Sequence, residues 1–174
     1  MIDYTIRNAH PSEFEKIGQL MVEVYSQLEG FPSPTAQPKY YATLANVGAF
    51  TLKPATELLV AVSNSKENYI AGALVYFEDM QHYGSGGIAI TEKNTSGFRL
   101  LAVDPAIRGK GIGKLLINEC IQKARDKNHK QVIIHSTSAM KIAWKMYERI
   151  GFKRSEELDF MQQDFPVYGF RLNL

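Results

Sequence analysis

The sequence contains one cysteine, Cys120, among 174 residues. A single cysteine cannot form an intrachain disulfide, and no group of Cys and His residues has the spacing of a zinc site, so we expect neither cross-links nor a metal. No stretch approaches the ~18 apolar residues of a membrane span, and the N-terminus shows no basic segment followed by an apolar one. These absences predict no membrane association and a cytoplasmic chain in a reducing compartment.

The composition lacks the marks of disorder and of fibrous chains. Hydrophobic residues make up 45% of the chain, aromatic residues 11% and charged residues 22%, which is typical of a soluble globular protein. The chain has no internal repeat and no low-complexity segment. Its length suits one compact domain that buries roughly two thirds of its extended-chain surface. We therefore treat residues 1–174 as a single domain.

Acidic residues are scarce in one part of the chain. Residues 104–154 contain 12 Lys and Arg against 4 Asp and Glu, a net charge of +8, whereas the remainder carries a net charge of −6. This contrast predicts that a ligand with several negative charges binds the cationic third, and it argues against a uniformly basic nucleic-acid binder. The alternative is a lysine-rich helix face in contact with water.

The first half of the chain predicts two helices and three strands. Ser12 and Glu15 have the spacing of a capping box, and apolar residues then recur at helical spacing up to Leu28. Residues 83–97 are rich in Gly, Ser, Thr and Asn and predict a loop with at most one short strand. The predicted elements are a strand over 2–7, a helix over 12–28, a short helix over 40–46, and antiparallel strands over 57–62 and 69–77.

The second half predicts a crossover unit. The apolar run 98–103 is typical of a buried strand, the next helix reaches about Lys127, and residues 131–135 form a second strand. A strand, a helix and a strand over this length make a right-handed crossover with parallel strands. The remaining predicted elements are a helix over 139–150 that ends at Gly151, a strand from Phe152, and a final antiparallel strand over 167–174.

Together these elements predict an α/β fold. Its sheet is mixed and mostly antiparallel, with six or seven strands, one parallel crossover and about four flanking helices. The exposed face of the final strand could support a homodimer.

The predicted crossover contains a glycine-rich turn, Arg108-Gly109-Lys110-Gly111-Ile112-Gly113-Lys114. Free N–H groups and the positive end of the helix dipole point outward at such a helix start, and glycines let a phosphate approach the backbone. The turn is not a P-loop, because Arg108 stands where its first glycine is required, nor a dinucleotide fingerprint, because Lys114 stands where the third glycine is required. The alternative is a tight turn that needs glycine for its geometry alone.

The pattern Arg-x-x-Gly-x-Gly resembles the acetyl-CoA-binding motif of the GNAT superfamily of N-acetyltransferases. The segment 143–152, with Ala143, Tyr147, Gly151 and Phe152, looks like a second motif of that family, A-x-x-x-Y-x-x-x-G-F. The resemblance implies that the two parallel strands splay apart and that the pantetheine of acetyl-CoA lies between them. Where many members have Asn, seven residues before the motif tyrosine, this chain has Met140. The residues that the resemblance implies for acetyl-CoA binding are Leu101, Val103, Arg108, Gly109, Lys110, Gly111, Ile112, Gly113 and Lys114.

The resemblance also implies a reaction, the transfer of an acetyl group from acetyl-CoA to a primary amine of a small molecule or a peptide. Tyr147 is the candidate for the residue that protonates the leaving thiolate; the alternative is a core aromatic residue. No base is singled out, and the residues that we considered are Glu78, His82, Glu92 and His135. Cys120 falls on the apolar stripe of its helix and predicts no acyl-cysteine intermediate.

The acceptor amine is not determined by the sequence. The segments that line the acceptor cleft in similar folds contain Pro32, Pro34, Tyr40, Tyr41, Tyr76 and Tyr83. Two rival functions stay open, a catalytically silent CoA-binding regulator and a nucleic-acid binder that uses the basic third.

Overall fold

The fold is described by a computed structural model that covers residues 3–174. Ile2, in the predicted N-terminal strand, lies outside the described residues. The helices are α1 (Phe14–Ser26), α2 (Pro38–Ala45), α3 (Ile112–Asp126) and α4 (Lys141–Ile150). The strands are β1 (Tyr4–Asn8), β2 (Thr56–Ser63), β3 (Ile70–Phe77), β4 (Thr95–Val103), β5 (Gln131–Ser136), β6 (Lys153–Arg154), β7 (Phe160–Gln162) and β8 (Phe165–Asn173).

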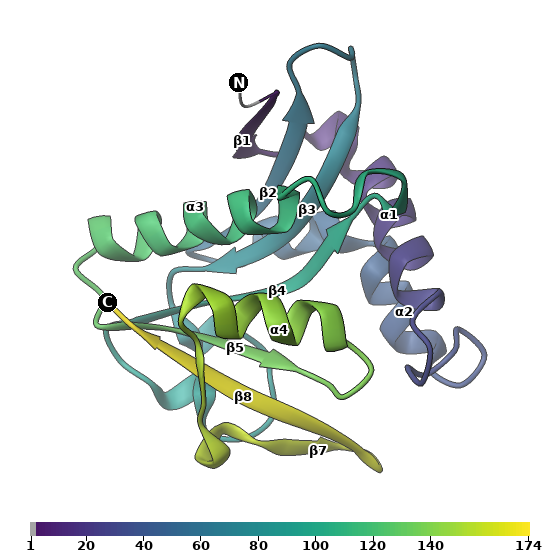
Figure 1. The fold of residues 1–174 in the computed structure, drawn as a ribbon. Helices are drawn as coiled ribbons and strands as arrows, with labels where there is room; N and C mark the ends of the chain where they lie inside the picture. Colours follow the sequence, from purple (N-terminus) through teal and green to yellow (C-terminus); the bar gives the residue numbers. More distant parts are fainter. Residues whose placement is uncertain (1–2) are drawn as a thin grey trace.

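The strands form one mixed sheet in the order β1-β2-β3-β4-β5-β8-β6, with β7 paired to β8 (Figure 1). Within residues 3–174, β4 and β5 are the one parallel pair, and α3 connects them. The predicted α/β class and its parallel crossover are therefore confirmed. The sheet has eight strands, whereas six or seven were predicted. The additional strand is β7, whose three residues are too few to show an alternation of polar and apolar side chains.

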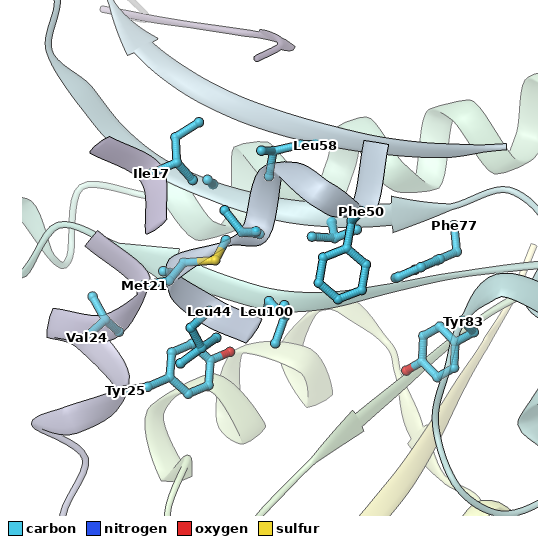
Figure 2. Packing of buried hydrophobic residues seen from close by; sticks show 14 of the residues in the cluster. Ile17, Met21, Val24, Tyr25, Leu44, Phe50, Leu58, Phe77, Tyr83 and Leu100 are labelled. Atoms are coloured by element: carbon cyan, nitrogen blue, oxygen red, sulfur yellow. The ribbon is translucent and has the colours of Figure 1, made fainter. Parts of the chain in front are cut away.

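Each face of the sheet carries its own hydrophobic core. On one face, α1 and α2 pack against β2, β3 and β4 (Figure 2). The residues buried there include Ile17 and Met21 of α1, which were predicted from helical spacing, and Leu44 of α2. On the other face, α3 and α4 bury a second cluster that includes Leu116, Cys120 and the rings of α4 and β8. Between residues 3 and 174, no helix is long and apolar enough to cross a membrane.

Several predicted boundaries differ from the structure by one to three residues, and two of them have an identifiable cause. Local hydrogen bonding explains the first. The helix α1 starts at Phe14, because Pro11–Glu13 form a 3-10 turn in which the Glu13 carboxylate accepts the backbone N–H of His10 at 2.8 Å. The capping residue is thus Glu13 and not Glu15. The second error lies in the predicted loop 83–97, whose last residues, 95–97, belong to β4 and pair with β5.

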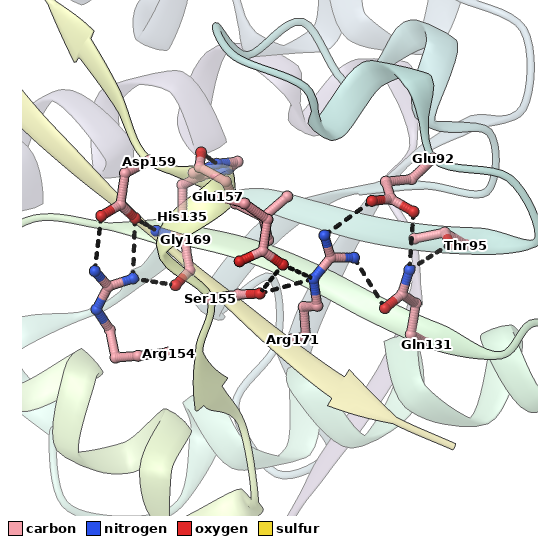
Figure 3. Close-up of polar contacts among 11 residues, drawn as sticks. Glu92, Thr95, Gln131, His135, Arg154, Ser155, Glu157, Asp159, Gly169 and Arg171 are labelled. Carbon is pink, nitrogen blue, oxygen red and sulfur yellow. Dashed lines mark hydrogen bonds and ion pairs between the residues drawn. The ribbon is translucent and has the colours of Figure 1, made fainter.

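Two arginines hold the C-terminal segment on the sheet (Figure 3). Arg154 donates two hydrogen bonds to Asp159, at 2.9 and 2.8 Å. Arg171 pairs with Glu92 at 2.8 Å and with Glu157 at 3.0 Å. These partly buried ion pairs place the chain between β6 and β7, so that the β7–β8 hairpin reaches the functional site described below.

The helices α1 and α2 touch at a glycine, and this contact gives a first prediction. A Cβ atom on Gly18 would lie 2.1 Å from the carbonyl oxygen of Ala45, so Gly18→Ala must push the two helices apart. An alanine in an exposed helix stabilises by up to about 1 kcal/mol relative to glycine, whereas we expect Gly18→Ala to destabilise the fold by about 1–3 kcal/mol. Urea unfolding measures the difference.

The control for this prediction is Gln19→Ala in the same helix, since Gln19 is exposed. It should leave the free energy of unfolding within about 0.5 kcal/mol of wild type. A Gly18→Ala protein as stable as wild type would show that α1 and α2 do not pack as closely as described.

Candidate functional site

The central feature of the site is a wedge between β4 and β5. These strands pair at three positions, from Thr95 to Gly97 of β4, although β4 continues to Val103 and β5 to Ser136. Beyond the paired positions the two strands diverge in Figure 1. The predicted splay is thereby present.

A β-bulge in β4 lies at this wedge. Val75 of β3 pairs with Arg99 and Ala73 with Ala102, so two residues of β4 oppose one residue of β3. Leu100, in the bulge, has φ of +60°, a left-handed conformation that non-glycine residues adopt rarely. The bulge re-aims the following side chains, and Leu101 and Val103 both line the wedge.

The wedge belongs to a cleft of about 1530 Å³ that has two ends. The first end is formed by the glycine-rich turn, α3 and α4, and we call it the anion end. The second end is formed by α1, the α1–α2 connection and the β7–β8 hairpin, and we call it the acceptor end. Leu101 and Tyr147 line the cleft together with residues of both ends.

Two glycines keep the turn at the anion end open. Gly109 has φ of +83° and Gly111 has φ of +81°, and no heavy atom lies within 4 Å of a Cβ built on either residue. Gly111 is the N-cap of α3 and no side chain caps it, so the first N–H groups of α3 are available to an anion. Glycine at position 113 is needed for packing and not for an open turn, since a Cβ atom there would lie 3.2 Å from the sulfur of Met146 in α4.

Most residues predicted for this end lie on the cleft. Leu101, Val103, Arg108, Gly109, Gly111, Ile112, Gly113 and Lys114 line it. Lys110 does not line the cleft and is exposed on the turn. Ile112 is buried in the core below the turn, so its backbone N–H and not its side chain is the group that it offers.

The end of β5 supplies two polar groups that sequence reasoning missed. The side-chain oxygens of Ser136 and Thr137 are buried and lack a hydrogen-bond partner among residues 3–174, and both residues line the cleft. Buried hydroxyls without partners are rare in folded proteins. A ligand with amide groups in the wedge would satisfy them, so the residues present fit a pantetheine chain.

Tyr147 lies in α4, with its ring packed on Phe98 and Phe152 at centroid distances of 6.0 and 5.9 Å. Its hydroxyl forms no hydrogen bond with the described part of the chain, and the residue lines the cleft. Burial raises the pKa of Tyr147 well above its ordinary value, so the phenol keeps its proton at neutral pH. The side chain is therefore a core ring with a protonated hydroxyl, on a residue that lines the cleft.

His135 and Tyr83 form a buried pair in the cleft. The Nε2 of His135 lies 2.9 Å from the carbonyl oxygen of Leu158, and its Nδ1 lies 3.0 Å from the Tyr83 hydroxyl. A carbonyl only accepts, so Nε2 carries the proton and Nδ1 accepts from Tyr83. Burial lowers the pKa of His135 to about 4. With both nitrogens engaged, His135 is a neutral structural residue and not a base.

The lowered pKa of His135 predicts a pH dependence of stability. An unfolded histidine with pKa ~6.5 binds a proton that the folded residue, with pKa about 4, excludes, so stability falls as the pH decreases from about 6.5 to 4. His135→Gln keeps a donor for Leu158 and should flatten this slope by about 1–3 kcal/mol over that interval. Urea unfolding at several pH values measures it; parallel slopes in the two proteins would contradict the assignment.

The acceptor end is walled by aromatic rings. Phe31 contacts Tyr25 at a centroid distance of 5.6 Å, Tyr40 at 5.7 Å and Phe165 of β8 at 5.8 Å. The Tyr25 hydroxyl donates to the carbonyl oxygen of Leu101 at 3.3 Å, which ties α1 to the bulged strand. Tyr25 and Phe165 were not predicted, because neither belongs to a local motif.

The other candidates divide between the cleft and the rest of the molecule. Pro32, Tyr40 and Tyr83 line the cleft as predicted. Pro34, Tyr41 and Tyr76 do not, and the Tyr76 hydroxyl bonds to Ser96 at 2.8 Å in the interior. The remaining base candidates are also outside: Glu78 pairs with Lys127 at 3.5 Å, Glu92 pairs with Arg171, and His82 does not line the cleft.

Cys120 is fully buried on the inner face of α3. Desolvation raises the pKa of the Cys120 thiol well above its ordinary value, so it stays a protonated thiol.

Comparisons with known proteins agree with this geometry. An N-acetylaspartate synthetase of Danio rerio is 37% identical over 68 residues, which are 39% of this chain and 24% of that protein. A GNAT acetyltransferase of Staphylococcus aureus superposes with a TM-score of 0.73 at 17% identity, covering 98% of this chain and 99% of its own. The PaiA N-acetyltransferase of Thermoplasma acidophilum, solved with coenzyme A, gives 0.69 at 16% identity, covering 97% and 98%.

The chain thus spans about a quarter of the length of that synthetase, whereas it covers the compared structures almost completely. The profile of the Acetyltransferase (GNAT) family matches residues 19–152, which include the glycine-rich turn, the wedge and Tyr147. With this match over most of its length, the chain belongs to the GNAT family of acetyltransferases.

Proposed function

We propose that this protein is an N-acetyltransferase that moves the acetyl group of acetyl-CoA to a primary amine by direct attack. The observation that carries the proposal is the continuous cleft that joins an open turn of backbone N–H groups, the β4–β5 wedge and the Tyr147 hydroxyl. Membership in the family and the coenzyme A complex of PaiA support it.

The anion end has the groups to hold coenzyme A. The first N–H groups of α3 have no side-chain cap, because the N-cap residue is Gly111, and they would bind the diphosphate. The charged side chains of Arg108 and Lys114, which line the cleft, would surround it. The hydroxyls of Ser136 and Thr137 would meet the pantetheine in the wedge. Acetyl-CoA, when bound, supplies an activated acetyl group and a thiolate leaving group.

Tyr147 has the chemistry to protonate that thiolate. The phenol is protonated at neutral pH, its hydroxyl has no partner among the described residues, and the residue lines the cleft. The acceptor must attack as a neutral amine, so an ammonium group loses one proton before attack, and the attacking nitrogen loses a second proton as the amide forms. We assign no base on the protein, because an amine can arrive already neutral and water can take the proton that leaves as the amide forms.

The test is an assay of the purified chain with acetyl-CoA and a library of amines, in which free thiol is measured. Acceptor-dependent thiol release supports the proposal. Heat of binding on titration with coenzyme A, without thiol release for any amine, would favour the silent regulator. A chain that binds no coenzyme A, but binds many nucleic acids with steep salt dependence, would overturn the proposal in favour of a nucleic-acid binder.

A further inference from the structure

The acceptor end contains an arginine, Arg99, whose charge no described carboxylate neutralises. Within residues 3–174, no Asp or Glu oxygen lies within 4.0 Å of its guanidinium. By contrast, Arg7, Arg154 and Arg171 each pair with a carboxylate at 2.8 Å. A half-buried guanidinium without a counter-ion in an apolar cleft favours an anionic ligand.

One edge of the Arg99 guanidinium is fixed and the other is free. Nη1 donates to the carbonyl oxygens of Tyr83 and Gly84, at 2.9 and 3.4 Å, and Cζ lies 5.8 Å from the centre of the Tyr83 ring. Nε and Nη2 form no hydrogen bond within residues 3–174. These two nitrogens form the side of the guanidinium that binds both oxygens of a carboxylate.

Arg99 lies apart from the groups that would meet the coenzyme A diphosphate. Its Cζ lies 5.8 Å from the centre of the Tyr83 ring, and Tyr83 belongs to the hydrophobic core beneath α1 and α2, so Arg99 lies on that face of the sheet. The other cations that line the cleft are Arg108 and Lys114 at the glycine-rich turn, and Lys141 and Arg149 in α4. The coenzyme phosphates therefore have their own partners, and Arg99 is left for the acceptor.

Side chains from the two walls of the acceptor end also meet across it. Gln37 before α2 donates to Gln163 of the β7–β8 turn at 2.8 Å, and Phe31 meets Phe165 beside this bridge. Glu29 is the one carboxylate among the described lining residues, and it is exposed and unpaired with Arg99. A small acceptor suits this space better than a folded protein surface.

We propose that Arg99 binds the carboxylate of a small acceptor that carries both a primary amine and a carboxylate, as an amino acid does. The inference rests on the proposed acetyltransferase function and names the acceptor class for the same site. Two parallel N–H···O hydrogen bonds from Nε and Nη2 would hold the acceptor while its amine points toward the wedge.

The experiment compares acceptors of nearly the same shape, with and without the carboxylate. Thiol release is measured with a set of L-amino acids and with the corresponding L-amino acid amides, and kcat/KM is taken for each pair. We expect the acids to exceed their amides at least about 10-fold for the wild type, although the amide amine is the more easily deprotonated. Arg99→Gln should reduce kcat/KM for the acids about 10- to 100-fold and leave the amides nearly unchanged.

Two further variants make the result specific. Arg99→Lys keeps the charge without the two-nitrogen edge and should retain part of the preference for acids. Arg125→Gln, an exposed arginine of α3 outside the cleft, should change neither series.

Coenzyme A binding, measured by calorimetry, separates the two proposals. If coenzyme A binds normally but amides or amines without a carboxylate are acetylated as well as the acids, or no acid is acetylated, the assignment of Arg99 is overturned. Absence of coenzyme A binding in the wild type would instead overturn the acetyltransferase itself.

Discussion

Replacing Gly111 by valine should weaken acetyl-CoA binding at least about 100-fold. Gly111 has φ of +81°, where a β-branched residue is strained, and it caps the helix whose first N–H groups would hold the diphosphate. The Gly111→Val chain would have to leave this conformation or place its side chain over those N–H groups. Each charge-assisted hydrogen bond lost reduces affinity by about 1.5–3 kcal/mol, so the loss of one or two accounts for the expected effect.

The control for strain is Gly151→Val. Gly151 has φ of +116° at the C-cap of α4 and does not line the cleft, so valine there is strained without touching the ligand. We expect this variant to lose stability and, at a temperature where it is folded by circular dichroism, to bind acetyl-CoA as wild type does. Calorimetry that finds normal affinity in the Gly111→Val protein would remove the turn from the binding site.

The second large effect is expected for Tyr147→Phe, whose kcat should fall about 100-fold or more while its Kd for acetyl-CoA stays within a factor of about 3. The hydroxyl has no hydrogen-bond partner in the described part of the chain, whereas the ring packs on Phe98 and Phe152. The substitution therefore removes a proton donor and preserves the packing. Steady-state kinetics and calorimetry on the same preparation separate the two quantities.

A matched substitution shows what a hydroxyl outside the cleft does. Tyr69 donates to Asp104 at 2.6 Å and does not line the cleft. Tyr69→Phe should lower the free energy of unfolding by about 1 kcal/mol through the lost hydrogen bond and leave kcat unchanged. Full turnover in the Tyr147→Phe protein would show that Tyr147 is a core ring and that the thiolate takes its proton from elsewhere.

The parts of the fold that were predicted correctly depend on neighbours in the chain. The crossover 98–135 follows from an apolar strand, a helix with a broad apolar stripe and a second apolar strand. The C-cap at Gly151 is likewise local, because φ above zero is a property of one residue; that Gly109 and Gly111 are also left-handed is a finding of the structure. Such features need no knowledge of distant contacts.

The errors arise where a residue distant in the sequence decides the local structure. The predicted capping box of Ser12 and Glu15 does not form; Glu13 instead accepts the backbone N–H of His10 and also pairs with Arg7 of β1 at 2.8 Å. The strand β7 forms because β8 pairs with it, although three residues carry no readable alternation. The left-handed Leu100 in the bulge breaks the pleat of a run that reads as a regular strand.

By itself the sequence determined the fold class and the position of the glycine-rich turn, because these depend on periodicity and on residues that are close along the chain; Tyr147 became a candidate only through the resemblance to the acetyltransferase motif. Only the tertiary structure decided which side chains share the cleft. Ser136, Phe165 and Arg99 come from different strands, and it is the divergence of β4 from β5 that brings them to one cavity. Whether a half-buried arginine has a counter-ion depends on every element packed around it, and no pattern within one segment records that.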